Sequence, residues 1–354
     1  MTRQAVAVAP AKLNLHLGVG ERGPDGYHPL CTVFQAVDLW ERVTVTLRDA
    51  PGVRINVAGV GAPRVPRDET NLAARAARAL ARRAGVDVAV DIEIDKTIPV
   101  AGGLAGGSAD AAATLLACDA LWETGLAPDD LREVAAALGA DVPFALMGGT
   151  ALGRGRGETL EPLPVATDVW WVLITSDRGL ATPEMFAAWD RAHGRLARGS
   201  TGVPGEVDRA GGTAGLSHAG RAGEAGSNVT PRGPAARRQL HPASPAEVGL
   251  QRPAHLIEAL TRGDLPEVGR LLVNDLQPCA LAAAPELGAR LSAALAAGAL
   301  GAVVSGSGPT IAALSASHDA AVRIAATLRS EPLACAATVA RAVPGGAHPL
   351  LDEA

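Results

Sequence analysis

The sequence is poor in cysteine and aromatic residues and contains no long apolar run. Its four cysteines are Cys31, Cys118, Cys279 and Cys335, and no two of them form a C-x-x-C pair. This spacing suggests neither a zinc site nor a disulfide framework, so a reducing cytoplasm is the expected location. Because no apolar run reaches the length of a membrane span, and the N-terminal segment lacks the apolar core of a signal peptide, we expect no membrane partner.

Lysine is almost absent, and the overall charge is negative. Of 32 basic residues only Lys12 and Lys96 are lysines, and the net charge of −5 argues against a general nucleic-acid partner. An ammonium is a compact charge that can point at one atom, whereas a guanidinium is a planar fork. The two lysines are therefore candidate functional residues. The length of 354 residues, with 48% hydrophobic and 19% charged, is typical of a globular protein with two domains.

The most informative stretch that is present covers residues 98–116, IPVAGGLAGGSADAAATLL. Four glycines lie between a strand-like run and an Ala-rich helical run, and glycine at this density needs a steric reason such as close approach to a bulky anion. Ser108 stands where a helix N-cap is expected, and the free amides of a helix start attract phosphate. We interpret the stretch as a nucleotide-phosphate loop, with a closely packed turn as the alternative.

Neither of the two common phosphate loops fits this stretch. Gly102 and Gly107 have Walker A spacing, but Ser108 and Ala109 stand where Lys and Ser/Thr are required. The dinucleotide fingerprint G-x-G-x-x-G is also missing, which argues against a dinucleotide-dependent oxidoreductase.

The apolar pattern predicts strands and helices along most of the chain. The expected strands cover residues 5–9, 13–19, 32–39, 42–47, 86–94, 169–175, 301–305, 311–315 and 336–341. The expected helices cover residues 71–84, 109–123, 130–138, 183–192, 254–261, 264–272, 285–297 and 319–330. Residues 194–253 are rich in Gly, Ala, Pro, Ser and Arg without periodicity, which indicates a disordered surface insertion.

Two charged residues outside the glycine loop are candidates for chemistry. Lys12 lies in PAKLNL between two expected strands, and Asp141 follows a helix stop at Gly139 in LGADVPF. Brought together over the glycine loop, they would form a phosphoryl-transfer site. Asp141 would accept the proton of an attacking alcohol, and Lys12 would keep the carboxylate ionised and neutralise the moving phosphoryl group. A surface lysine and an aspartate that caps the next turn are the alternatives.

Three loops carry weaker signals. Tyr27, the single tyrosine, stands beside His28 in PDGYHPL, where a ring and an imidazole can stack on and hydrogen-bond a heteroaromatic base. The alternative is an aromatic residue that simply packs over the domain. SGSGP at 305–309 is either a second close-approach loop or a hairpin turn, and GRGRG at 153–157 is expected to be a β-turn cluster.

The order and spacing of five motifs resemble the GHMP kinase superfamily. They are PAKLNLHLGV, DGYHPLCTVFQAVDL, IPVAGGLAGGSADAA, LGADVPF and SGSGP, and the resemblance spans nearly the whole chain except residues 194–253. PAKLNL and DGYH are most similar to the branch that phosphorylates a cytidine-diphosphate-linked methylerythritol. The resemblance implies an α+β fold of two domains with the active site in the cleft between them. It places a nucleotide-binding domain at residues 1–160 and a C-terminal domain at residues 161–354.

The resemblance also implies the reaction and the roles of individual residues. The γ-phosphoryl group of Mg-ATP would pass to the tertiary 2-hydroxyl of the methylerythritol unit, with no protein ligand assigned to Mg²⁺. Lys12 and Asp141 match the catalytic pair. Asn14 and His28 match substrate contacts, with His28 reading the cytosine and Tyr27 and Phe186 stacking on it. The ATP side would comprise Asn71, Lys96, Pro99, Val100, Ala101, Gly102, Gly103, Leu104, Ala105, Gly106, Gly107 and Ser108.

The glycine loop departs from the family pattern at several positions. Ala101 and Ala105 stand where the family more often has glycine, and Ala109 with Asp110 replaces a polar pair. Asp110 is placed either to reach Mg²⁺ or to favour the helix dipole. Two other functions are weighed: a GHMP kinase of the homoserine or mevalonate type, and a non-catalytic nucleotide-binding protein of this fold. PAKLNL and DGYH argue against the first, and the presence of both Lys12 and Asp141 argues against the second.

Overall fold

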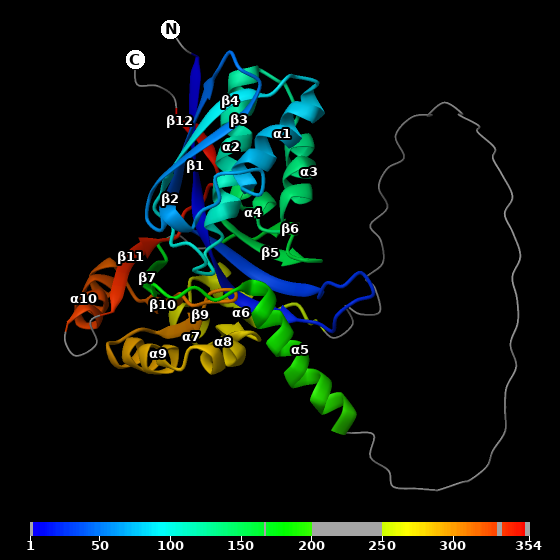
Figure 1. Ribbon diagram of the computed structural model, residues 1–354. Coiled ribbons are helices and arrows are strands. Elements are labelled where there is room, and N and C mark those ends of the chain that lie inside the picture. Colours follow the sequence, from blue (N-terminus) through cyan, green and yellow to red (C-terminus); the bar gives the residue numbers. More distant parts are fainter. Residues whose placement is uncertain (1–2, 166–167, 200–249, 331–334, 351–354) are drawn as a thin grey trace, which may run out of the picture.

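The protein folds around two β-sheets, each covered by helices, as expected for an α+β protein (Figure 1). The computed structural model describes residues 3–165, 168–199, 250–330 and 335–350. Within these residues, no helix is both long enough and apolar enough to cross a membrane.

The larger sheet has eight strands, and its central order is β12-β1-β2-β4-β3. β5 pairs with β2 and β6, and β8 pairs with β1. The strands are β1 (Gln4–Val19), β2 (Leu30–Leu47), β3 (Gly52–Gly59), β4 (Ala89–Lys96), β5 (Thr150–Arg154), β6 (Thr159–Pro162), β8 (Val273–Asn274) and β12 (His348–Leu350).

β1 and β2 form one long antiparallel hairpin, which corrects the sequence-based prediction of two strands on each side. The predicted break at Pro10 is a register shift between Pro10 and Ala11, where the chain continues without leaving the sheet. A local irregularity tolerates proline, which cannot donate a ladder hydrogen bond. Lys12 therefore lies inside a strand, and not in a connection between two strands.

Four helices lie on one face of the larger sheet (Figure 1). They are α1 (Leu72–Ala84), α2 (Gly106–Trp122), α3 (Pro128–Leu138) and α4 (Val142–Met147), and a short 3₁₀ helix (Ala62–Arg64) follows β3. α2 packs directly on β1 and β2, where buried residues such as Leu13 and Leu115 form the main core.

The start of α2 differs from the sequence-based prediction. The helix begins at Gly106, its N-cap is Ala105, and no side chain caps it. The Ser108 amide donates to the Ala105 carbonyl at 2.9 Å, so Ser108 already belongs to the first turn and is not the N-cap. The reason is the left-handed conformation of Ala105 (φ 58°), which turns the chain into the helix before Ser108 is reached.

The smaller sheet has the strand order β11-β7-β10-β9. Its strands are β7 (Trp170–Thr175), β9 (Gly301–Val304), β10 (Ile311–Ser315) and β11 (Ala336–Arg341). The helices of this half are α5 (Thr182–Gly199), α6 (Ala254–Arg262), α7 (Leu265–Arg270), α8 (Gln277–Ala283), α9 (Glu286–Ala296) and α10 (His318–Arg329). The domain boundary near residue 160 stays a prediction, and β12, from beyond it, pairs with β1.

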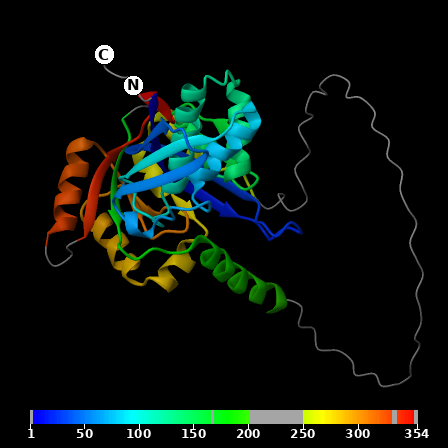
Figure 2. The same cartoon turned by 45° about the horizontal axis from the view of Figure 1, so that its top comes forward.

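The predicted insertion is shorter at its ends than expected. α5 continues to Gly199, five residues past the expected start at 194, and Figures 1 and 2 both show it extending away from the body. At the other end, Arg252 forms an ion pair with Glu161 at 2.7 Å, and the Gln251 carbonyl accepts a hydrogen bond from the Cys31 thiol. The remainder of the predicted insertion, residues 200–249, lies outside the described residues.

Candidate active site

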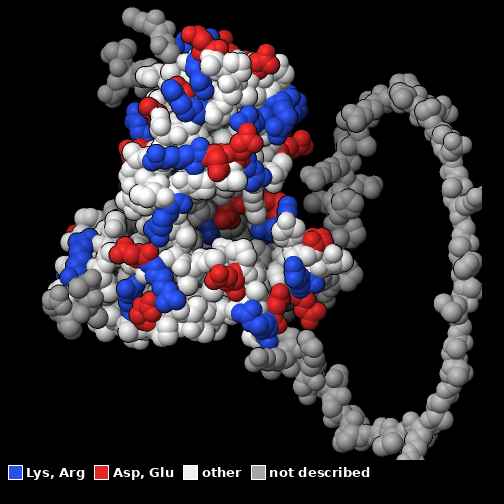
Figure 3. Space-filling view, viewed as in Figure 1, with Lys and Arg blue, Asp and Glu red and all other residues white. Residues whose placement is uncertain are grey.

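A cavity of about 1040 Å³ lies between the two halves of the molecule. Figure 3 shows the surface hollowed there, with residues of both charge signs visible inside. Basic side chains outnumber acidic ones in its lining, which suits anionic ligands. The basic ones are Lys12, Arg22, Arg64, Arg75, Lys96 and Arg156, and the acidic ones are Asp110, Asp141 and Asp190.

The glycine loop forms one wall of this cavity. Of its expected ATP-binding residues 99–108, all line the cavity except Leu104, whose side chain is fully buried in the core. Gly103 has a positive φ of 77°, and a Cβ there would lie 2.1 Å from the Ser305 carbonyl oxygen, so glycine is required. The uncapped first turn of α2 opens from the same loop, and its amide groups are available to an anion.

The SGSGP loop is both a hairpin turn and a close-approach loop, the two alternatives that the sequence left open. It connects the antiparallel strands β9 and β10, so it is a hairpin turn. It also packs on the glycine loop, because the Ser305 hydroxyl donates to the Gly103 carbonyl at 3.1 Å and the Thr310 amide donates to the Gly102 carbonyl at 3.3 Å. The connection between β9 and β10 in the smaller sheet therefore fixes the position of the glycine loop.

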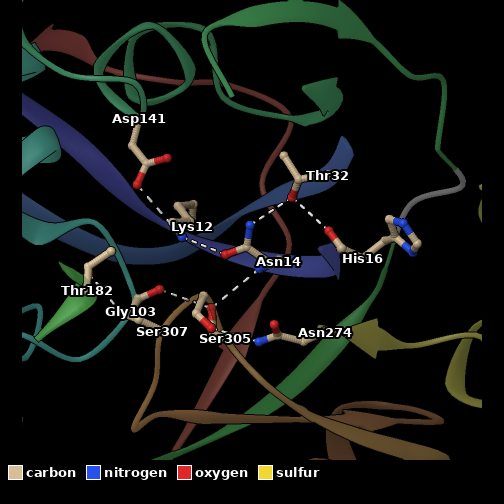
Figure 4. Close-up of polar contacts among 11 residues, drawn as sticks. Lys12, Asn14, His16, Thr32, Gly103, Asp141, Thr182, Asn274, Ser305 and Ser307 are labelled. Carbon is tan, nitrogen blue, oxygen red and sulfur yellow. Dashed lines mark hydrogen bonds and ion pairs between the residues drawn. The ribbon is translucent and has the colours of Figure 1, made fainter. Parts of the chain in front are cut away.

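Lys12 and Asp141, about 130 residues apart, meet at the floor of the cavity (Figure 4). Lys12 Nζ lies 3.8 Å from Asp141 Oδ2. Asp141 occupies the N-cap position of α4, yet its side chain makes no capping bond, so the capping alternative is wrong. Lys12 is buried in β1, which excludes the surface-lysine alternative. Burial lowers the pKa of Lys12, and the neighbouring Asp141 carboxylate partly offsets this effect.

Asn14 holds the Lys12 ammonium from the other side. Its Oδ1 accepts a hydrogen bond from Lys12 Nζ at 2.6 Å. Its Nδ2 donates to the Thr32 hydroxyl at 2.8 Å, and Thr32 in turn donates to the His16 carbonyl (Figure 4). This chain of bonds runs from β1 to β2 and fixes the amide oxygen toward the ammonium.

The expected base-binding residues line the other end of the same cavity. The rings of His28 and Phe186 stack with centroids 5.2 Å apart, and Tyr27 stands 54% exposed. His28 Nε2 lies 3.2 Å from Asp190 Oδ1, and its Nδ1 lies 2.9 Å from the Gly20 carbonyl. Both imidazole nitrogens therefore have partners, so recognition of a base by this ring would require one partner to be exchanged.

Lys96 takes part in a buried charge cluster beneath the glycine loop. Its Nζ lies 2.5 Å from Glu41 Oε1 and 2.9 Å from Asp110 Oδ2. Burial and the Asp110 charge raise the pKa of Glu41 to about 7, and Lys96 opposes this shift. Burial also raises the pKa of Asp110, against the effect of Lys96. Asn71 lines the cavity nearby and caps α1, because its Oδ1 accepts from the Ala73 amide at 2.8 Å.

Three residues of the site escaped the sequence analysis. Glu41 lies between the expected strands 32–39 and 42–47, where nothing in the pattern marks it as the partner of Lys96. Asp190 lies one helical turn after Phe186 on α5, a spacing that could have suggested a shared face. Arg156 lies in the GRGRG run, which was predicted as a turn; the structure has the turn at residues 155–158, whereas Gly153 and Arg154 end β5.

Comparison with known proteins assigns both halves of the chain to one family. The model of the GHMP kinases N terminal domain matches residues 71–149, and that of the GHMP kinases C terminal domain matches residues 256–334. The 4-diphosphocytidyl-2-C-methyl-D-erythritol kinase of Kineococcus radiotolerans is 45% identical over 92% of this chain and 86% of its own length. The enzyme of the same name from Thermobifida fusca is 45% identical over 93% of this chain and 92% of its own length.

Solved structures agree with this assignment. A crystal structure of 4-(cytidine 5'-diphospho)-2C-methyl-D-erythritol kinase, 30% identical, covers 99% of this chain and 98% of its own, with a TM-score of 0.62. A homoserine kinase from Cytophaga hutchinsonii has a TM-score of 0.68 and covers 98% of this chain and 97% of its own. Because it is only 21% identical, it shows the shared fold alone.

Proposed function

The chain belongs to the GHMP kinase superfamily, in the group of the 4-diphosphocytidyl-2-C-methyl-D-erythritol kinases, and from this membership we propose that it transfers the γ-phosphoryl group of Mg-ATP to the 2-hydroxyl of that cytidyl alcohol. The observation that carries the proposal is that the Lys12–Asp141 pair, the glycine loop and the Tyr27–His28–Phe186 group line one cavity.

The two ends of the cavity suit the two nucleotides of this reaction. The triphosphate of ATP would lie against the backbone of residues 101–108 and the first turn of α2, with the adenosine toward Asn71. The cytosine would lie between Tyr27 and Phe186 beside His28. A volume of about 1040 Å³ is at the upper end of the range usual for small-molecule sites, which suits two ligands bound together.

The floor of the cavity supplies the chemistry. Asp141 would accept the proton of the attacking hydroxyl, because its carboxylate is not used as a helix cap and is 32% exposed to the cavity. Lys12, held by Asn14, would neutralise charge on the alkoxide and the moving phosphoryl group. The basic lining would stabilise both anionic ligands before transfer.

The residues near the glycine loop fit a magnesium ion that travels with ATP. Ser108 lines the cavity, and Asp110 Oδ1 is buried without a hydrogen-bond partner among the described residues. Mg²⁺ prefers oxygen donors and is usually held by one or two carboxylates together with substrate phosphates. Ser108 and Asp110 would hold it, and the ion would supply neutralisation of the phosphate charge.

The test is ADP release by the purified protein with different acceptors. We expect release with 4-diphosphocytidyl-2-C-methyl-D-erythritol and only background release with homoserine, with mevalonate or without an acceptor. Release that depended on homoserine or mevalonate would replace the proposed substrate. Absence of release with every acceptor, with ATP binding retained, would favour a non-catalytic nucleotide-binding protein.

A further inference from the structure

The GRGRG turn reaches the cavity, and the proposed reaction uses its Arg156 only as one of several basic lining residues. It joins β5 to β6, and the Gly155 carbonyl accepts a hydrogen bond from the Leu30 amide at 2.6 Å. This bond ties the turn to the start of β2, three residues after Tyr27. Arg156, at the tip of the turn, lines the cavity together with Tyr27.

The guanidinium of Arg156 covers one face of the Tyr27 ring. The guanidinium carbon lies 4.7 Å from the ring centroid, within the range of a cation–π contact. Glu158 orients the arginine, because it accepts from the Arg156 amide at 2.6 Å and its carboxylate lies 4.0 Å from the guanidinium. Within the described part of the chain, no aromatic ring stacks on Tyr27.

The main chain of Tyr27 is fixed, whereas its ring depends on this contact. The Tyr27 amide donates to Asp25 Oδ1 at 3.0 Å, and the Tyr27 carbonyl accepts from the Gly23 amide at 2.7 Å. The residue is nevertheless 54% exposed, so core packing does not hold the ring. A half-exposed ring that must stack on a base loses conformational freedom when the base binds. A contact that orders the ring beforehand reduces that loss.

We propose that Arg156 is a positioning residue for the acceptor: its guanidinium holds the Tyr27 ring by one face and leaves the other face for the nucleobase. This inference rests on the proposed function for the identity of the base. A cation–π contact at an exposed site has a modest energy, so loss of Arg156 is expected to weaken acceptor binding by roughly two- to fivefold. ATP binds at the other end of the cavity, so its affinity is expected to stay unchanged.

The single tyrosine of the chain makes a direct test possible. Biosynthetic 3-fluorotyrosine gives one ¹⁹F resonance, which reports on Tyr27 alone. Without ligand, Arg156→Gln should shift this resonance, Arg156→Lys should shift it less, and Arg154→Gln should leave it in place. Arg154 is the matched control, because it ends β5 two residues before Arg156, is exposed and does not line the cavity. Equal spectra for the two glutamine variants would overturn the contact.

Ligand titration then separates this inference from the proposed function. With CDP as the probe, the wild-type resonance should move, and the dissociation constant should rise by roughly two- to fivefold in Arg156→Gln. In turnover, the KM for the cytidyl acceptor should rise by a similar factor, whereas kcat and the KM for ATP stay constant. Equal increases in both KM values would overturn the role of Arg156. A wild-type resonance unmoved by CDP would overturn the proposed acceptor, and with it that role.

Discussion

At the scale of single residues, the site depends on buried charges that lie beside charges of the opposite sign. Lys12 and Asp141 face each other at 3.8 Å, and Lys96 faces two carboxylates at hydrogen-bond distance. Buried charges persist only when partners compensate for lost hydration. Removing one member therefore changes the protonation of the others, and two predictions follow this logic.

Asp141→Asn removes the proposed proton acceptor and keeps the shape of the side chain. We expect kcat to fall by roughly 10²- to 10⁴-fold, the usual contribution of a positioned general base. ATP affinity should stay the same, because the glycine loop does not use this carboxylate. The measurement is steady-state ADP release together with equilibrium ATP binding. Asp129→Asn on the exposed start of α3 is the control, and near-normal turnover of Asp141→Asn would exclude the base assignment.

Glu41 is expected to make stability depend on pH. Its pKa is raised from 4.5 to about 7 by burial and by Asp110, so the folded protein binds a proton that the unfolded chain has lost between these values. The free energy of unfolding should therefore fall as the pH rises from about 4.5 to 7, by at most about 1.4 kcal/mol per pH unit from this group.

Urea unfolding at pH 5, 6, 7 and 8 measures this dependence. Glu41→Gln mimics the protonated side chain and should flatten the profile in that window, with part of the slope remaining because burial also raises the pKa of Asp110. The exposed Glu133→Gln on α3 should leave the profile unchanged. Parallel profiles for wild type and Glu41→Gln would refute the shift.

At the scale of elements, the glycine loop was predictable in place but not in detail. Its position before an Ala-rich helix follows from the local pattern, and the structure agrees. The helix start at Gly106 depends on Ala105 adopting a left-handed conformation, which propensity disfavours for a residue with a Cβ. In the same way, the continuity of β1 through Pro10 depends on pairing with β2, which lies outside any local window.

Ala105 stores a small amount of strain that glycine would remove. Its φ of 58° costs an L-residue about 1 kcal/mol, so Ala105→Gly should raise the free energy of unfolding by about 0.5–1 kcal/mol. Ala109, four residues later inside α2, is the matched control. There glycine should lower stability by about 1 kcal/mol or more, since it weakens the helix. Urea unfolding should give changes in the free energy of unfolding of opposite sign for the two variants. A loss of stability in both would contradict the proposed strain at Ala105.

Gly103 should tolerate no side chain, because a Cβ there has no space as well as an unfavourable backbone conformation. Gly103 and Gly125 have similar φ values of 77° and 65°, but a Cβ at Gly103 meets the Ser305 carbonyl at 2.1 Å whereas one at Gly125 meets nothing within 4 Å. Gly125→Ala should cost about 1 kcal/mol of stability and leave kinetics intact. Gly103→Ala should cost more and also raise the KM for ATP, because the loop must move. Equal kinetics in both variants would show that the loop position is not needed.

At the scale of the whole molecule, the sequence motifs identified the family and most of the cavity lining, but not the contacts between segments. Lys12, Asp141 and the glycine loop are each marked by local patterns, and the fold brings them together. Glu41, Asp190 and Arg156 act through neighbours that are distant in sequence, and only Asp190, one helical turn after Phe186, has a local spacing that hints at its place. The parts missed are those whose role depends on tertiary contact alone.

β1 belongs to both halves of the protein. It pairs with β12 near its start and with β8 near its end, and it carries Lys12 and Asn14 between these two contacts. A sliding motion of one half over the other would therefore act on the strand that carries the ammonium. Chimaeras that exchange the C-terminal half for that of a relative would have to keep this strand and its two neighbours from one parent.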